Sequence, residues 1–141
     1  MHTLFDRLDR AIARRRDEQI AFVQRLVQAR SDNPFTPETS NPAAPVEREV
    51  AALIAAQLSD LGFEPELNGL TPERPNVVAQ LRGADGGPAL ILNGHMDTVP
   101  AGSGWTRDPW GGTIEAGRLY GRGALDMKAS LAMMIYAAAA L

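Results

Sequence analysis

The sequence of 141 residues predicts an α/β fold, and three observations lead to this class. Apolar residues recur at helical spacing over residues 3–29 and 46–61. Short runs typical of strands follow at 77–81 and 89–92, with glycines between them. The chain is 45% hydrophobic and 22% charged, a composition typical of a globular domain rather than a disordered segment.

The helical part of the chain comes first. Two apolar stripes predict two helices with a break near the arginine run at 14–16; they consist of Leu4, Leu8 and Ile12, and of Ile20, Val23 and Val27. Four prolines predict a loop over residues 31–45. The apolar spacing from Val46 to Leu61 predicts another helix, which Gly62 would end.

The predicted strands occupy the middle of the chain. Phe63 and Leu67 flank a proline and predict a short edge strand. The runs at 77–81 and 89–92 predict two strands joined by a glycine-rich hairpin at 83–87. The second run is apolar on both faces, so we expect a central strand covered on each side. Residues 113–115 and 118–120 predict a small hairpin, and a final apolar helix is predicted from about Met127.

Charge and cysteine content exclude several classes of function. A formal net charge of −3 argues against a nucleic-acid-binding domain, which would carry a basic excess. The run Arg14–Arg16 is therefore expected to be a solvated helix face rather than a nucleic-acid or membrane contact. The chain has no cysteine, which excludes disulfides, thiolate zinc sites and cysteine nucleophiles. Without a signal peptide or an apolar run long enough to span a bilayer, a cytoplasmic location is expected.

His95 and Asp97 follow the predicted central strand, where α/β proteins often bind ligands. Two residues apart in an extended chain, their side chains point to the same side. A metal-bound imidazole usually donates its other N–H to a carboxylate or a carbonyl, and His-x-Asp supplies both parts. The alternative is a structural histidine beside a turn aspartate.

Two further residues have both a structural and a functional interpretation. Asp126 precedes the last helix, so it could be an N-cap, or it could be a carboxylate with two oxygens free to bridge metal ions. For Lys128 a structural ion pair is favoured over a catalytic role, and Arg122 could hold the loop before Asp126.

Several motifs together indicate a family. They are HMDTVP at 95–100, WTRDPW at 105–110, GRLYGRG at 117–123 and DMK at 126–128. In this order and spacing the chain resembles the co-catalytic zinc amidohydrolases, which include acetylornithine deacetylase, succinyl-diaminopimelate desuccinylase, aminoacylase and glutamate carboxypeptidase. The resemblance extends more weakly back to about Gln19, which leaves residues 1–18 as an N-terminal helical extension and 19–141 as the family-like region.

The resemblance implies roles for three residues. His95 matches the histidine ligand of one metal ion, Asp126 matches the carboxylate that bridges two ions, and Asp97 matches the acid of the catalytic machinery that orients the histidine ring. The implied cofactor is a pair of Zn²⁺ ions, with Co²⁺ or Mn²⁺ as substitutes, and the implied reaction is hydrolysis of an amide beside a carboxylate. The resemblance also implies a mixed central sheet flanked by helices and a cis peptide bond between Asp126 and Met127. Family members usually have glycine where this chain has Ala129.

The resemblance also defines what this sequence lacks. The family's general-base glutamate, its neighbouring glutamate ligand and its remaining acidic and histidine ligands all match positions beyond Leu141. We therefore expect the N-terminal part of a longer hydrolase that acts on N-acyl amino acids or peptides and forms a homodimer at full length. We expect this part to be inactive alone.

The rival interpretation is a partial domain without a competent metal site. A phosphate-binding loop at Gly121–Gly123 is a weaker hypothesis, because the spacing of nucleotide-binding motifs is missing.

Overall fold

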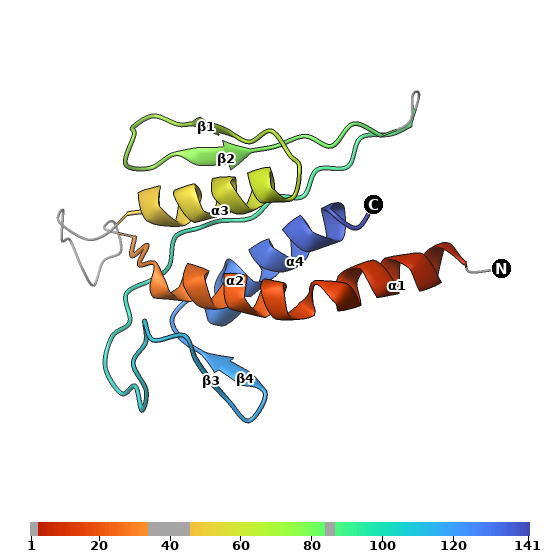
Figure 1. Cartoon of the computed structure of the whole chain (residues 1–141). Coiled ribbons are helices and arrows are strands. Elements are labelled where there is room, and N and C mark those ends of the chain that lie inside the picture. The colour runs from red at the N-terminus through yellow and green to blue at the C-terminus, as the bar shows by residue number, and fades with distance from the viewer. Residues whose placement is uncertain (1–2, 34–45, 84–86) are drawn as a thin grey trace.

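The computed structural model describes residues 3–33, 46–83 and 87–141 (Figure 1). The elements in chain order are α1 (Leu4–Arg14), α2 (Arg16–Gln28), α3 (Arg48–Asp60), β1 (Glu66–Asn68), β2 (Asn76–Val78), β3 (Thr113–Glu115), β4 (Arg118–Tyr120), the π-helical turn η1 (Ala124–Lys128) and α4 (Ala129–Ala138). The predicted α/β class is confirmed, as helices combined with small antiparallel sheets. Residues 34–45 of the predicted loop and 84–86 of the predicted hairpin lie outside the described residues.

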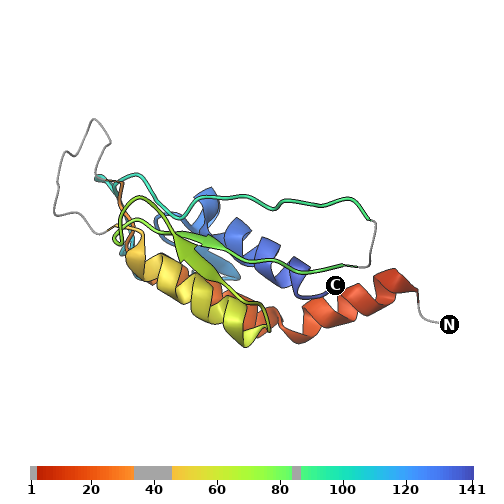
Figure 2. The same cartoon turned by 90° about the horizontal axis from the view of Figure 1, so that it is seen from above.

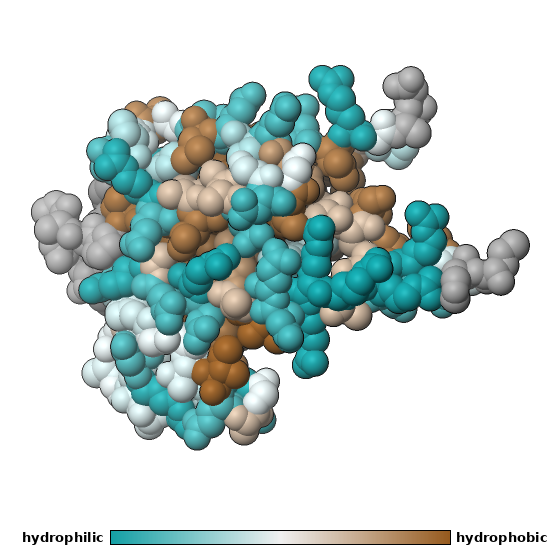
Figure 3. Space-filling model, viewed as in Figure 1, coloured by the Kyte–Doolittle hydropathy of each residue, from teal (hydrophilic) through white to brown (hydrophobic). Residues whose placement is uncertain are grey.

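The two predicted N-terminal helices are confirmed, and their break falls at Arg15, whose φ of −105° and ψ of 10° leave the helical region. A capping box starts α1: the Thr3 hydroxyl accepts from the Asp6 amide, and the Asp6 carboxylate accepts from the Thr3 amide. No residue of α1 is buried, and its first turns project beyond the end of α4 (Figures 1 and 2). Hydrophilic residues cover most of the face of α1 seen in Figure 3.

The hydrophobic core lies where α2 packs against α3 and α4. Each helix contributes one apolar stripe, because residues three or four apart share a helix face. Phe22 and Tyr136 meet with ring centroids 6.3 Å apart, and the Tyr136 hydroxyl donates to Glu18 at 2.9 Å. The buried members of the core are Phe22, Leu26, Ala29, Val50, Ile54, Leu58, Leu131, Ala132 and Tyr136.

The strands in the described residues form two separate antiparallel pairs. β1 pairs with β2, with Leu67 opposite Val77, and this sheet packs on α3. β3 pairs with β4 as predicted, and the turn between them places both Ala116 and Gly117 in the left-handed region, at φ of 49° and 75°. Two residues with positive φ are the requirement of the tightest hairpin turn. A single parallel bridge joins Asp32 to Thr98, outside these sheets.

The prediction of a central strand at residues 89–92 is wrong. Residues 87–97 run as an extended chain alongside α4 (Figures 1 and 2), without forming a ladder with any strand in the described part of the chain. Leu90 and Ile91 are 81% and 84% exposed. An apolar run gives a segment the propensity for a strand, but the strand forms only where a neighbour supplies the ladder hydrogen bonds.

The last helix begins with a sharp bend. Gly123 has a φ of 79°, the peptide bond between Asp126 and Met127 is cis as the resemblance implied, and α4 then starts at Ala129. Ala129 has a φ of −65° and a ψ of −40°. Any L-residue adopts this helical conformation, so alanine is accepted where the family usually has glycine.

Replacing Leu26 by alanine should lower the free energy of unfolding by about 2–5 kcal/mol, because Leu26 is fully buried and its loss leaves a cavity. Leu90→Ala is the matched control, since this leucine is 81% exposed and its truncation should change stability by no more than about 0.5 kcal/mol. Urea unfolding of both variants measures the difference. Equal losses would mean that residues 89–92 are buried after all.

Gly123→Ala should destabilise the protein more than Gly117→Ala, although both glycines have a positive φ. The left-handed backbone costs an alanine about 1–2 kcal/mol at either position. At Gly117 a Cβ would meet nothing within 4 Å, whereas at Gly123 it would lie 2.5 Å from Cγ2 of Thr98. We expect the additional loss at Gly123 to be about 1–3 kcal/mol, measured by the same unfolding experiment. Equal losses would show that Thr98 moves aside freely.

Candidate functional site

His95, Asp97 and Asp126 come together in the structure. Nδ1 of His95 lies 3.0 Å from Oδ1 of Asp97, and Nε2 lies 2.9 Å from Oδ1 of Asp126. Nδ1 also lies 3.1 Å from the carbonyl oxygen of Asp97, and the His95 amide donates to the sulfur of Met127. The three residues to which the resemblance gives related roles therefore lie together, and the imidazole has one carboxylate at each ring nitrogen.

The two carboxylates differ in their surroundings. The Asp97 side chain is 28% exposed, and its Oδ2 accepts a hydrogen bond of 2.7 Å from the side-chain amide of Asn33. The Asp126 side chain is 84% exposed. Of the two groups, Asp97 is held within the protein, whereas Asp126 faces solvent.

The charges around His95 stabilise its protonated form. Burial alone lowers the pKa of the ring, but the hydrogen bond to Asp126 and the hydrogen bond and charge of Asp97 outweigh it, so the pKa lies above the ordinary value. A cation bound at the ring would meet the same negative field from both carboxylates. The site thus favours positive charge.

The segment after α2 holds the chain that carries His95. The Thr98 amide donates to the Ser31 carbonyl and the Asn33 amide donates to the Thr98 carbonyl, both at 2.8 Å. The Ser31 hydroxyl donates to the carbonyl of Met96 at 2.7 Å. Asn33 was not predicted as a site residue, because it lies 64 residues before Asp97 in a segment predicted only to be a loop.

Asp126 is not a helix cap in the described structure. The residues at the starts of η1 and α4 are Gly123 and Lys128, and neither makes a side-chain capping bond. The oxygen of Asp126 instead meets His95. The N-cap interpretation is therefore wrong.

Lys128 and Arg122 fix the loops on either side of the bend. Lys128 is fully buried and donates to the carbonyl of Ala29 at 2.7 Å, where the sequence analysis expected a carboxylate. Burial lowers the pKa of Lys128 to about 8, against the opposing charges of Asp32 and Glu49. Arg122 donates to the carbonyl of Ala101 at 3.0 Å and stacks over Trp105, so it holds the preceding loop.

The donor set fits part of a metal site. An imidazole nitrogen and a carboxylate are ligands that Zn²⁺ accepts, and a carboxylate on the other ring nitrogen is the usual partner of such an imidazole. A complete site needs at least three protein ligands. The described residues contain no group of three or more histidine, cysteine or acidic side chains arranged to hold an ion. His95 and Asp126 thus suit a metal site to which further ligands would have to be added.

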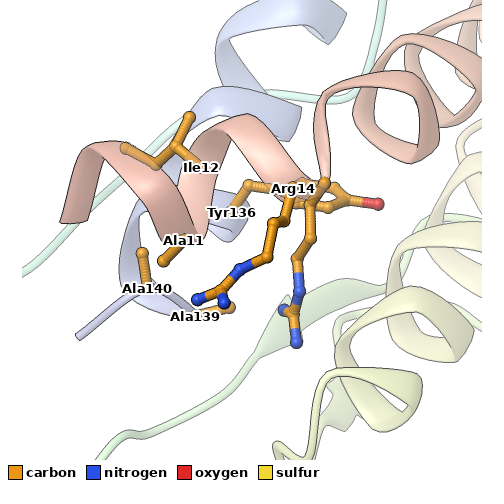
Figure 4. Close-up of a pocket in the computed structure, with 7 residues that line it drawn as sticks. Ala11, Ile12, Arg14, Tyr136, Ala139 and Ala140 are labelled. Atoms are coloured by element: carbon orange, nitrogen blue, oxygen red, sulfur yellow. The ribbon is translucent and has the colours of Figure 1, made fainter. Parts of the chain in front are cut away.

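Two pockets lie outside this cluster. One, of about 310 Å³, lies between α1 and the end of α4 (Figure 4). Its lining is apolar apart from two arginines and a tyrosine, so it offers no acid or base for hydrolysis; the residues are Ala11, Ile12, Arg14, Arg15, Tyr136, Ala139 and Ala140. The other, of about 420 Å³, is mostly apolar and is lined in part by Trp105, Tyr120 and Leu125. Leu125 is the residue before Asp126 in the sequence.

Comparison with known proteins gives the same family as the motifs. Residues 91–141 match the model of peptidase family M20/M25/M40, and this range includes His95, Asp97 and Asp126. The chain is 42% identical over 98 residues to a succinyl-diaminopimelate desuccinylase of Gluconobacter oxydans, which covers 67% of this chain and 25% of that protein. The desuccinylase of Leptothrix cholodnii is 49% identical over 94 residues, 61% of this chain and 24% of its own length.

The chain therefore spans about a quarter of the length of these curated relatives. Every helix in the described part of the chain falls short of the length or hydropathy that a membrane span requires. The predicted resemblance is confirmed: over residues 91–141, the region that carries the candidate site, the chain matches peptidase family M20/M25/M40.

Proposed function

We propose that this chain supplies part of the active site of a metal-dependent hydrolase that cleaves an amide bond next to a carboxylate. The observation that carries the proposal is the His95 ring, with its nitrogens 3.0 and 2.9 Å from the carboxylates of Asp97 and Asp126. The match of residues 91–141 to a peptidase family supports the same reaction class.

Each of the three residues has a proposed task. Nε2 of His95 and the carboxylate of Asp126 would be metal ligands, with Asp126 shared between two Zn²⁺ ions, or between Co²⁺ or Mn²⁺ ions in their place. Asp97 would act through His95, by keeping the proton on Nδ1 so that Nε2 has its lone pair free. When bound, the metal pair supplies a Lewis acid for the substrate carbonyl and a water molecule of lowered pKa. The remaining ligands and the general base would come from residues outside this sequence.

The proposed substrate is a small N-acyl amino acid or a peptide. The relatives reported above carry the name succinyl-diaminopimelate desuccinylase, so an N-succinyl amino acid is the first compound to test. The surface around Trp105, Tyr120 and Leu125 is a candidate apolar contact for such a substrate. We propose a homodimer for the longer protein, without a nucleic-acid or membrane partner.

In a longer protein that contains this chain, Asp97→Asn should reduce metal affinity or turnover by about 10–100-fold, the usual effect of removing a carboxylate behind a metal-bound histidine. An amide keeps the size of the side chain but not the charge that steadies the ring. The measurement is zinc affinity by competition with a chelator, together with kcat on N-succinyl and N-acetyl amino acids.

Asp60→Asn is the matched control, because Asp60 is exposed at the end of α3 and the same chemical change there should leave both values unaltered. His95→Ala should abolish turnover. An Asp97→Asn enzyme with wild-type zinc affinity and kcat would contradict the proposed task of Asp97.

Residues 1–141 alone should show no hydrolysis, because His95 and Asp126 are two ligands where a zinc site needs three or more. The chain should be assayed with Zn²⁺ or Co²⁺ on N-acyl amino acids and dipeptides, beside a longer protein and a His95→Ala variant of the chain. Turnover by the short chain above that of the variant would overturn this expectation. No turnover by the longer protein would favour the rival interpretation, a domain without a competent metal site.

A further inference from the structure

We propose that Asn33 is a positioning residue for His95. Through its hydrogen bond to Oδ2 of Asp97 it turns Oδ1 of that carboxylate toward Nδ1 of His95, and so leaves Nε2 of the ring unprotonated on the side of Asp126. This inference rests on the proposed function, because the position of the proton matters if His95 is a metal ligand. A metal ion binds an imidazole nitrogen that carries no proton.

Two contacts constrain the carboxylate of Asp97: a hydrogen bond from Asn33 and an ion-pair contact with His95. Oδ2 lies 2.7 Å from Nδ2 of Asn33, and Oδ1 lies 3.0 Å from Nδ1 of His95. An ionised carboxylate only accepts hydrogen bonds, so Oδ2 faces the NH₂ group of the asparagine, and Oδ1 favours a proton on Nδ1 of the ring. Rotation about the Cβ–Cγ bond would stretch both contacts together. Asn33 therefore fixes the plane of the carboxylate that His95 meets.

The backbone fixes Asn33 in turn. Its amide donates to the carbonyl of Thr98 at 2.8 Å, and the Thr98 amide donates to Ser31 at the same distance. Both bonds are made by Thr98, the residue that follows Asp97, so the asparagine is held in register with its target. The preceding residue, Asp32, is only 6% exposed and is paired with Arg30 at 2.6 Å.

Asp126 competes with Asp97 for the proton of the neutral His95 ring, so the position of Asp97 affects which nitrogen carries it. With a carboxylate at each nitrogen, a neutral imidazole can place its proton on either side. Nδ1 faces two acceptors of Asp97, the Oδ1 oxygen and the main-chain carbonyl at 3.1 Å. Asp126 offers one oxygen at 2.9 Å from a side chain that is 84% exposed, where water weakens its attraction. The backbone fixes the main-chain carbonyl, and a carboxylate held by Asn33 adds a second acceptor that shifts the tautomer toward a protonated Nδ1.

The test is the ring-nitrogen spectrum of His95 in the 15N-labelled chain, recorded at a pH well above the raised pKa of His95 so that the ring is neutral. His2→Gln removes the only other histidine and assigns the signals. We expect a protonated Nδ1 and an unprotonated Nε2. In Asn33→Leu, which keeps the bulk but cannot donate, the two shifts should move toward each other. Asn33→Ala is the second variant.

Ser31→Ala is the matched control. It removes the neighbouring side-chain bond from the same segment, to the carbonyl of Met96, and leaves Asn33 intact. A tautomer that changes in the Asn33 variants and not in Ser31→Ala supports the proposal. The wild-type pattern in a folded Asn33 variant, or the same change in Ser31→Ala, would overturn it. Loss of the wild-type circular dichroism in both Asn33 variants would also overturn it, because Asn33 would then serve folding.

This spectrum needs neither metal nor substrate, so its outcome is independent of the hydrolase activity. In the longer protein, Asn33→Leu should lower zinc affinity by about 10–100-fold and Ser31→Ala should not. A changed tautomer in a protein without hydrolase activity would leave the positioning role intact and refute the proposed function alone.

Discussion

The candidate site depends on the short parallel contact between residues 31–33 and 96–98. His95 lies on an extended chain that forms no ladder within the described residues, so a sheet does not hold it there. Two main-chain bonds of 2.8 Å, between Thr98 and Ser31 and between Asn33 and Thr98, take the place of that ladder. Since Ser31 comes shortly after the end of α2 at Gln28, the core packing of Phe22 and Leu26 on α2 also sets where His95 lies.

The same segment connects the second half of the site. Lys128 donates from a fully buried position to the carbonyl of Ala29, at the end of α2. A buried ammonium group is costly without partners, and here a carbonyl at 2.7 Å and the charge of nearby Asp32 compensate part of that cost. Asp126 lies two residues before Lys128. The end of α2 is therefore held on one side to the chain of His95 and on the other to the turn of Asp126.

Local patterns predicted the elements that depend on local physics. The apolar stripes predicted α2 and α3, and the Ala116-Gly117 pair predicted the β3–β4 turn, because helix faces and tight turns depend on neighbouring residues. The prediction of a strand at 89–92 was wrong, because the apolar character of this segment does not specify a pairing partner. His95 and Asp97 were predicted to share a side, whereas the residues alone left Asp126 as either a helix N-cap or a bridging carboxylate and the family resemblance favoured the second. Asn33 had no local signal, since its partner is 64 residues away.

The surroundings of Asp97 and Asp126 suit these two identical side chains to different roles. Asp97 is 28% exposed and bound by Asn33, so its charge acts at a fixed place and through a medium from which water is partly excluded. Asp126 is 84% exposed, so reorienting it breaks one contact to His95 and disturbs no buried group. A carboxylate that holds the His95 ring in place benefits from the partly buried environment of Asp97. A carboxylate that also binds a second partner benefits from the exposed environment of Asp126. Burial, rather than residue type, thus separates the carboxylate proposed to position His95 from the one proposed to bridge metal ions.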